Sequence, residues 1–118
     1  MIKIKGITEK ERKAIAEYEE LLLKKFPRRI REIILFGSKS RGDFSQTSDI
    51  DLLIVVSRDG KKIRNEITAL THEPVAKYLV DLSPIIVEED FFKEWSPLLK
   101  HIKKDSITIW TNKSKKSM

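Results

Sequence analysis

Two aspartates one residue apart, Asp49 and Asp51, stand at the polar start of an apolar segment that ends at Val56. In an extended strand alternate side chains share a face, so both carboxylates point the same way with α-carbons about 6.6 Å apart. Like charges about 4 Å apart repel by on the order of 4 kcal/mol at an effective dielectric of 20, and a bound cation relieves that repulsion. Oxygen ligands suit Mg²⁺, which completes its coordination shell with substrate phosphates. The pair therefore supplies half of a magnesium-triphosphate site.

An isolated Asp-x-Asp pair more often caps a turn or lies solvated at a strand end, so a second motif must support the metal interpretation. Gly37-Ser38 follows an apolar run that ends at Phe36. Glycine lets the backbone approach a ligand closely, and the amides that open a helix hold phosphate oxygens. The segment is not a P-loop, because Gly-x4-Gly-Lys-Ser/Thr is absent. Gly-Ser and the aspartates together favour a site for a metal-bound triphosphate.

The composition favours one small domain of an intracellular protein. The 118 residues are 40% hydrophobic and 36% charged, which suits a single core, and we expect one domain over 1–112 with a disordered basic tail at 113–118. No apolar run is long enough to cross a membrane, so we expect a cytoplasmic protein. There is no cysteine and there are only two histidines, so any metal should be bound by oxygen.

The formal charge of +6 invites a nucleic-acid interpretation, but half of it comes from Lys113, Lys115 and Lys116. Without that tail the body carries only +3 (6 − 3), so nucleic acid is not the expected partner. A nucleic-acid binder that uses the tail remains an alternative, and its affinity would fall steeply with salt.

The periodicity of apolar residues and the positions of glycine and proline predict alternating helices and strands. Thr8 and Glu11 have capping-box spacing, and Pro84 favours an edge or bulge position in its strand. Pro74 indicates a kink or a fresh helix start. The expected elements are a helix over 8–25, a strand over 30–36, a short helix over 38–41, a strand over 49–56, helical segments over 60–79, a strand over 80–87, one or two helices over 88–104 and a strand over 107–110.

The motif order resembles the minimal nucleotidyltransferase (MNT) family of the DNA polymerase beta-like superfamily. The residues that carry the resemblance are Gly37, Ser38, Arg41, Gly42, Ser48, Asp49, Asp51 and Leu52. The resemblance implies an α+β fold with a small mixed β-sheet flanked by helices in the order α-β-α-β-α-β-α-β. It also implies two divalent ions, expected to be Mg²⁺, and transfer of a nucleoside monophosphate from an NTP with release of pyrophosphate.

The family pattern also assigns roles to individual residues. Asp49 and Asp51 would be catalytic metal ligands, and a third carboxylate normally joins from the next strand, where Asp81 is the matching residue. A polar strand start explains Asp81 nearly as well. The rival carboxylates occupy a turn or helices, where solvation accounts for them; they are Asp59, Glu66 and Asp90. Gly37 and Ser38 would bind the triphosphate.

Arg41 and the aromatic residues each allow two interpretations. Arg41 could bind a phosphate or could clamp a nearby carboxylate such as Asp43. The aromatic residues could stack on a base, but their spacing favours the core; they are Phe91, Phe92, Trp95 and Trp110. His72 and His101 are expected at the surface or at helix ends.

Two functions from different classes follow. By resemblance, the chain would be an antitoxin that transfers AMP from ATP to a helical HEPN-type toxin partner. Alternatively, it would be a catalytically weak or silent binding module that neutralises its partner by contact, with a homo-oligomer also open. Replacing Asp49 and Asp51 by asparagine would abolish the first function and leave the second unchanged.

Overall fold

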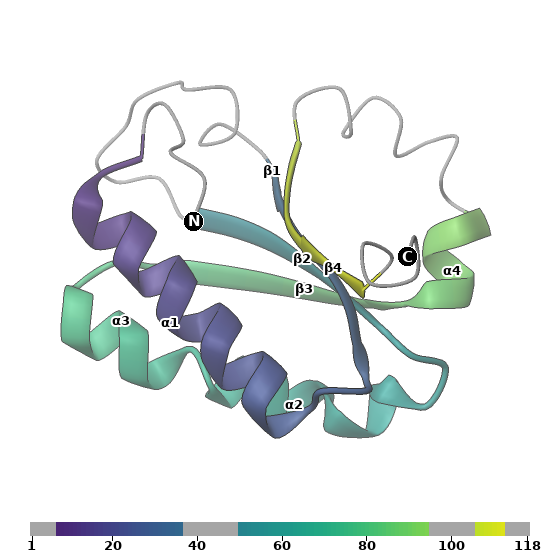
Figure 1. Cartoon of the computed structure of the whole chain (residues 1–118). Helices are drawn as coiled ribbons and strands as arrows, with labels where there is room; N and C mark the ends of the chain where they lie inside the picture. The colour runs from purple at the N-terminus through teal and green to yellow at the C-terminus, as the bar shows by residue number, and fades with distance from the viewer. Residues whose placement is uncertain (1–6, 37–49, 95–105, 113–118) are drawn as a thin grey trace.

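The computed structural model describes residues 7–36, 50–94 and 106–112 (Figure 1). Helices cover both faces of one sheet, in an α+β arrangement that agrees with the expected fold class. The short helix expected over 38–41 and the tail at 113–118 lie outside the described residues. The elements in chain order are α1 (Glu9–Lys25), β1 (Ile30–Phe36), β2 (Ile50–Val56), the 3-10 helix η1 (Gly60–Ile63), α2 (Arg64–Ala69), α3 (His72–Tyr78), β3 (Leu82–Glu88), α4 (Glu89–Glu94) and β4 (Ile107–Thr111).

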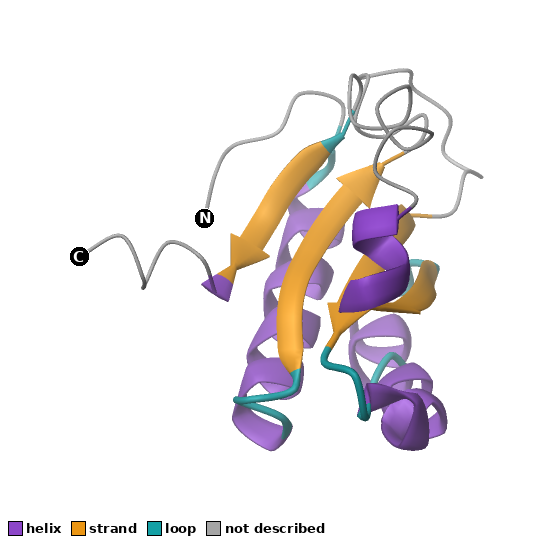
Figure 2. Ribbon diagram, turned by 90° about the vertical axis from the view of Figure 1, so that its right-hand side faces the viewer, coloured by secondary structure: helices purple, strands orange, loops and turns teal. Residues whose placement is uncertain are grey.

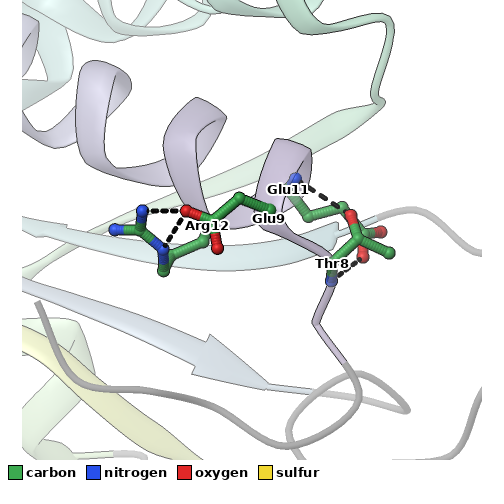
Figure 3. A network of polar contacts seen from close by, with 4 residues as sticks. All are labelled: Thr8, Glu9, Glu11 and Arg12. Carbon is green, nitrogen blue, oxygen red and sulfur yellow. Dashed lines mark hydrogen bonds and ion pairs between the residues drawn. The ribbon is translucent and has the colours of Figure 1, made fainter.

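Helix α1 begins with the capping box that its sequence predicts (Figure 3). The Thr8 hydroxyl accepts a hydrogen bond from the Glu11 N–H at 3.1 Å, and the Glu11 carboxylate accepts one from the Thr8 N–H at 2.9 Å. Arg12 pairs with Glu9 one turn along the exposed side. Two of the amide groups that a helix start leaves without a partner are thereby satisfied.

The buried side of α1 packs on the sheet and on α3, and its Tyr18 reaches α2. Ala14, Ile15 and Leu22 are buried there, and the hydroxyl of buried Tyr18 donates a hydrogen bond of 2.8 Å to the Ile67 carbonyl. Burial raises the pKa of Tyr18, so the phenol keeps the proton that it donates. This bond fixes α2 beside the middle of α1.

The four strands form a mixed sheet in the order β3-β2-β1-β4. Strand β1 is antiparallel to both β2 and β4, whereas β2 and β3 are parallel. The family resemblance implied a mixed sheet, and this topology confirms it. Strand β2 therefore lies between two neighbours from Asp51 to Val56, which explains its unbroken apolar run after Asp51.

The two faces of the sheet are covered unequally. Helices α1, α2 and α3 cover one face, and α4 alone packs on the other within the described residues (Figures 1 and 2). Strand β2 sends Leu52, Ile54 and Val56 into the larger core, and Leu53 and Val55 into a smaller core with α4. Because side chains alternate along β2, successive residues enter the two cores in turn.

Pro84 lies on β3, which is an edge strand, as its sequence predicts. The Ile50 N–H donates to the Asp81 carbonyl at 3.0 Å, which fixes the phase of the parallel ladder. In that phase residues 83, 85 and 87 direct their backbone groups toward β2, and residues 82, 84 and 86 direct theirs outward. Pro84 has no N–H, but this position faces away from β2. The pairing of β3 with β2 therefore loses no hydrogen bond.

Pro74 lies in the first turn of a fresh helix, which is one of the two alternatives that the sequence left open. Helix α3 begins at His72, and proline is tolerated in the first turn because its N–H would have no helical partner there. One expectation about the core is corrected by the structure. Phe91 is 48% exposed and is not a core residue, whereas Phe92 is buried against the sheet, as predicted. Trp110 is partly buried against the larger core. The described helices include none with the length and apolar character needed to cross a membrane.

Candidate functional site

Asp51 interrupts the apolar sequence of β2 at its second residue. The register pairs it with Phe36 on β1 and with Ser83 on β3, and Asp51 is only partly exposed. Leu52 points into the larger core, so Asp51 faces the side of the sheet on which α4 packs. Its carboxylate is thus flanked by an aromatic side chain on one strand and a hydroxyl on the other.

Asp81 directly precedes β3 and is exposed. Its carbonyl already belongs to the ladder with β2, and Leu82 beside it is buried in the larger core. Alternation along the strand therefore puts Asp81 and Ser83 on the same face as Asp51. The α-carbons of Asp51 and Asp81 are diagonal neighbours on adjacent strands, about 7–8 Å apart for such a pair. We call this part of the sheet, Asp51 with Asp81 and Ser83, the carboxylate end.

The donor set at the carboxylate end consists of oxygen atoms, two of its members being carboxylates. Mg²⁺ in phosphate-handling sites is held by one or two carboxylates and takes its other ligands from water and substrate. The residues present therefore fit such an ion. No three histidine or acidic side chains converge on one point within the described stretches, so a larger ligand set would require residues beyond them.

The remaining predicted site residues lie outside the described residues. They are Gly37, Ser38, Arg41 and Asp49, and their predicted roles stay predictions. The chain leaves the described part at Phe36 and re-enters it at Ile50, and both residues lie at the carboxylate end of the sheet. The Gly-Ser segment thus begins one residue beyond the strand neighbour of Asp51.

The rival carboxylates and His72 lie where the sequence indicated. Asp59 is in a turn, Glu66 on α2 and Asp90 on α4, and each is within 4 Å of a basic side chain: Arg29–Asp59 at 3.6 Å, Lys25–Glu66 at 3.5 Å and Arg58–Asp90 at 2.8 Å. The Ser57 hydroxyl and the charge of Arg29 lower the pKa of Asp59. His72 is exposed at the first residue of α3. Ion pairing and solvation account for these groups.

Ser83 was not among the predicted site residues. Its hydroxyl lies on the strand next to Asp51 and on the same face, so it can orient a carboxylate or a bound water. The signal in the sequence was its spacing of two residues from Asp81. Only the parallel register shows that this spacing aligns Ser83 with Asp51.

Comparison with known proteins identifies the family of this chain. Residues 15–115 match the family described as "Nucleotidyltransferase domain". A protein of Methanocaldococcus jannaschii named "Putative protein adenylyltransferase" is 40% identical over 89 residues, which cover 73% of this chain and 85% of the relative. A second protein of that organism with the same description is 36% identical over 62 residues, covering 52% of this chain and 63% of the relative.

A solved structure extends the similarity to the fold. It is described as a "putative nucleotidyltransferase" from Sulfolobus solfataricus, and it superposes with a TM-score of 0.56 at 26% identity, covering 96% of this chain and 94% of its own. The family match spans most of the chain, and the first relative is similar along most of its own length. The chain therefore belongs to the nucleotidyltransferase domain family and is a nucleotidyltransferase.

Proposed function

We propose that this protein transfers AMP from ATP to another protein. The observation that carries the proposal is the placement of Asp51 on the interior strand β2, on the same sheet face as Asp81 and Ser83, in a member of the nucleotidyltransferase family. The acceptor class and the adenylyl group are supported by the names of the two relatives from Methanocaldococcus jannaschii. We expect the reaction to run in the cytoplasm, where ATP is available.

In the proposed reaction an oxygen of the acceptor attacks the α-phosphorus of ATP. The bond from that phosphorus to the bridging β-phosphate oxygen breaks, pyrophosphate leaves, and the acceptor oxygen loses its proton to solvent. Asp51, Asp81 and Asp49 would hold two Mg²⁺ ions, which would neutralise the charge that develops on the phosphates. Ser83 would orient the carboxylate of Asp51, while Gly37, Ser38 and Arg41 would bind the triphosphate.

The acceptor that we propose is a helical protein of the HEPN type, with this chain as its antitoxin. The basis is the resemblance of the Gly-Ser and Asp-x-Asp motifs to the MNT family.

The test uses ATP labelled at the α-phosphate, Mg²⁺ and the purified protein encoded beside this chain's gene. We expect label on that protein, and we expect Asp51→Asn to abolish it. Asp59→Asn is the matched control, because it makes the same substitution in an exposed turn at the opposite end of β2. Neutralisation of the partner that survives Asp51→Asn would favour a binding module instead. Absence of labelling with every NTP, and of Mg-NTP binding by calorimetry, would refute the enzymatic proposal.

A further inference from the structure

The end of the sheet opposite Asp51 carries a concentration of basic side chains. It is formed by the last turn of α1, the turn into β1, η1 and the start of α2. We call it the basic end and define it by Lys24, Lys25, Arg28, Arg29, Lys62 and Arg64. Helix α1 ends here, and Ile30 at the start of β1 pairs with Val56 at the end of β2.

Two ion pairs bring these four segments together. Lys25 on α1 lies 3.5 Å from Glu66 on α2, and Arg29 lies 3.6 Å from Asp59 in the turn after β2. The Arg29 carbonyl also accepts a hydrogen bond of 2.8 Å from the Ser57 N–H. The other four cations stand one to three residues along the chain from a member of these pairs, at the same end of the sheet; they are Lys24, Arg28, Lys62 and Arg64.

These four cations are exposed, and within the described ranges none lies within ion-pair distance of a carboxylate. On the side of the sheet that α1 and α2 cover, the acidic residues beside these cations are Glu20 one turn before Lys24, Asp59 and Glu66. Glu88, Glu89 and Asp90 stand at the same end on the side of α4, where Glu89 pairs with Arg31 and Asp90 with Arg58. On the α1 side six cations thus face three carboxylates, two of which are already paired, so that side carries an excess of positive charge.

The character of the basic end favours phosphate over a protein surface. The exposed large apolar side chains of the described part are Leu79, Ile85 and Phe91, and all belong to the stretch from α3 to α4. The basic end therefore lacks the apolar centre of a typical protein interface. Phe26, its aromatic residue, is 9% exposed and cannot stack on a base. Single-strand binders use such stacking platforms, so a duplex fits better.

We propose that the basic end binds the phosphate backbone of a nucleic-acid duplex without reading its sequence. Lysines and arginines that replace condensed counterions on phosphates provide the affinity. The proposal does not depend on the acceptor or on AMP transfer, because this surface lies at the other end of β2 from Asp51. It also differs from binding by the tail, because it places the contacts on folded elements.

The test measures binding of unrelated 24-base-pair DNA and RNA duplexes by fluorescence anisotropy over a series of NaCl concentrations. One full-length variant replaces Lys24, Arg28, Lys62 and Arg64 by glutamine. A matched control with the same net charge replaces Lys10, Lys13, Lys77 and Lys93, which are exposed elsewhere on the molecule. A third variant replaces the tail residues Lys113, Lys115 and Lys116 by glutamine.

We expect the wild-type protein to bind duplex, and the first variant to lose at least about tenfold in affinity at low salt. Its slope of log affinity against log salt should fall by about 3–4, since each lost phosphate contact removes about 0.9. The matched control should retain most of the affinity and slope. Equal losses in both variants, a loss confined to the tail variant, or no wild-type binding at low salt would overturn the proposal. The DNA and RNA arms identify which duplex is preferred.

Discussion

The two ends of β2 both carry charge, but they carry it on different kinds of structure. The carboxylate end puts Asp51 inside the sheet, between two strands and partly out of solvent. The basic end puts its cations on a helix terminus, turns and a helix start, where they are exposed. A charge fixed in a sheet loses hydration and gains a defined position, whereas an exposed lysine keeps its hydration and its freedom. The defined position of Asp51 suits catalysis. The exposed cations suit attraction of phosphates, in which each cation adds to the affinity and salt weakens it.

Helix α1 connects the two ends. Its 17 residues extend about 25 Å, close to the roughly 23 Å of a seven-residue strand. Its C-terminus leads through a short turn into β1, so its capped N-terminus lies toward the carboxylate end and Lys24 and Lys25 lie at the basic end. Acidic residues in its first turn and lysines in its last turn both stabilise the helix dipole. The first turn of α1 thus contains acidic residues and its last turn contains lysines, which matches the acidic and basic ends of β2.

The largest expected effect is on catalysis at the carboxylate end. Asp51→Asn should lower nucleotidyl transfer by about 10³–10⁴, because a metal ion contributes several kcal/mol and each 1.36 kcal/mol is tenfold in rate. Asp81→Asn should cost about 10²–10³, since Asp81 is exposed and precedes its strand. Initial rates with labelled ATP measure both. A larger loss from Asp81→Asn would contradict the importance that we assign to the interior strand.

The next effect is on stability, at the basic end. A Cβ added at Gly60 would lie 2.5 Å from both Cβ and Cγ2 of buried Val56, so Gly60→Ala forces the turn away from β2. We expect a loss of about 2–3 kcal/mol in the free energy of unfolding and a melting temperature lower by about 10 °C. Lys62→Ala, at an exposed site nearby, should change it little. An unchanged melting temperature for Gly60→Ala would show that this turn adapts easily.

A smaller loss of stability is expected near the carboxylate end. Thr8→Ala removes the hydroxyl that accepts from the Glu11 N–H and should cost about 1 kcal/mol. Glu11→Ala removes the reciprocal bond. Urea unfolding of both variants and of the double variant gives their coupling energy, and strictly additive losses would mean that the two bonds act independently. Duplex binding at the far end of α1 should not change.

The smallest effect concerns the ion pair at the basic end. The Ser57 hydroxyl and Arg29 lower the folded-state pKa of Asp59, so its stabilising contribution is present at neutral pH and is lost as the pH falls through that lowered pKa. Asp59→Asn should therefore lower the melting temperature slightly at neutral pH and not at all in strong acid. Calorimetry over a pH series measures the difference. A difference that persists in acid would mean that the carboxylate charge is not its cause.

Strands β1 and β2 were predictable because most of their residues are apolar and buried. Ile30–Phe36 agrees with the predicted bounds, and Ile50–Val56 lies within the predicted range 49–56. Pro84 indicated an edge or bulge position because the missing N–H is tolerated at such positions, and the structure shows the edge. Periodicity could not give the order of strands or the parallel pairing of β2 with β3, which depend on packing across the chain. Ser83 was therefore missed, although the sequence places it two residues after Asp81.

Local irregularities were less predictable. Leu79 ends α3 with φ of 56°, a left-handed conformation in which glycine or asparagine is expected, so nothing in its residue type marked that end. The exposure of Phe91 was not predictable, because periodicity does not distinguish which of two adjacent phenylalanines turns inward. The basic end could not be found from the net charge, because only folding brings residues 24–29 beside residues 59–66. At the candidate site, the residue types could be read from the sequence, whereas the face that they share follows from the strand register.

Pro84 has a consequence for how copies of this protein meet in a crowded cell. An open strand edge invites another molecule to extend the sheet by pairing backbone to backbone, which is the first step of many aggregates. Along β3 the missing donor falls in the middle of the outward row, between Leu82 and Ile86, so an approaching strand would meet a gap in its hydrogen bonds there. Pro84 thus protects the solubility of the strand that follows Asp81, at no cost to its pairing with β2.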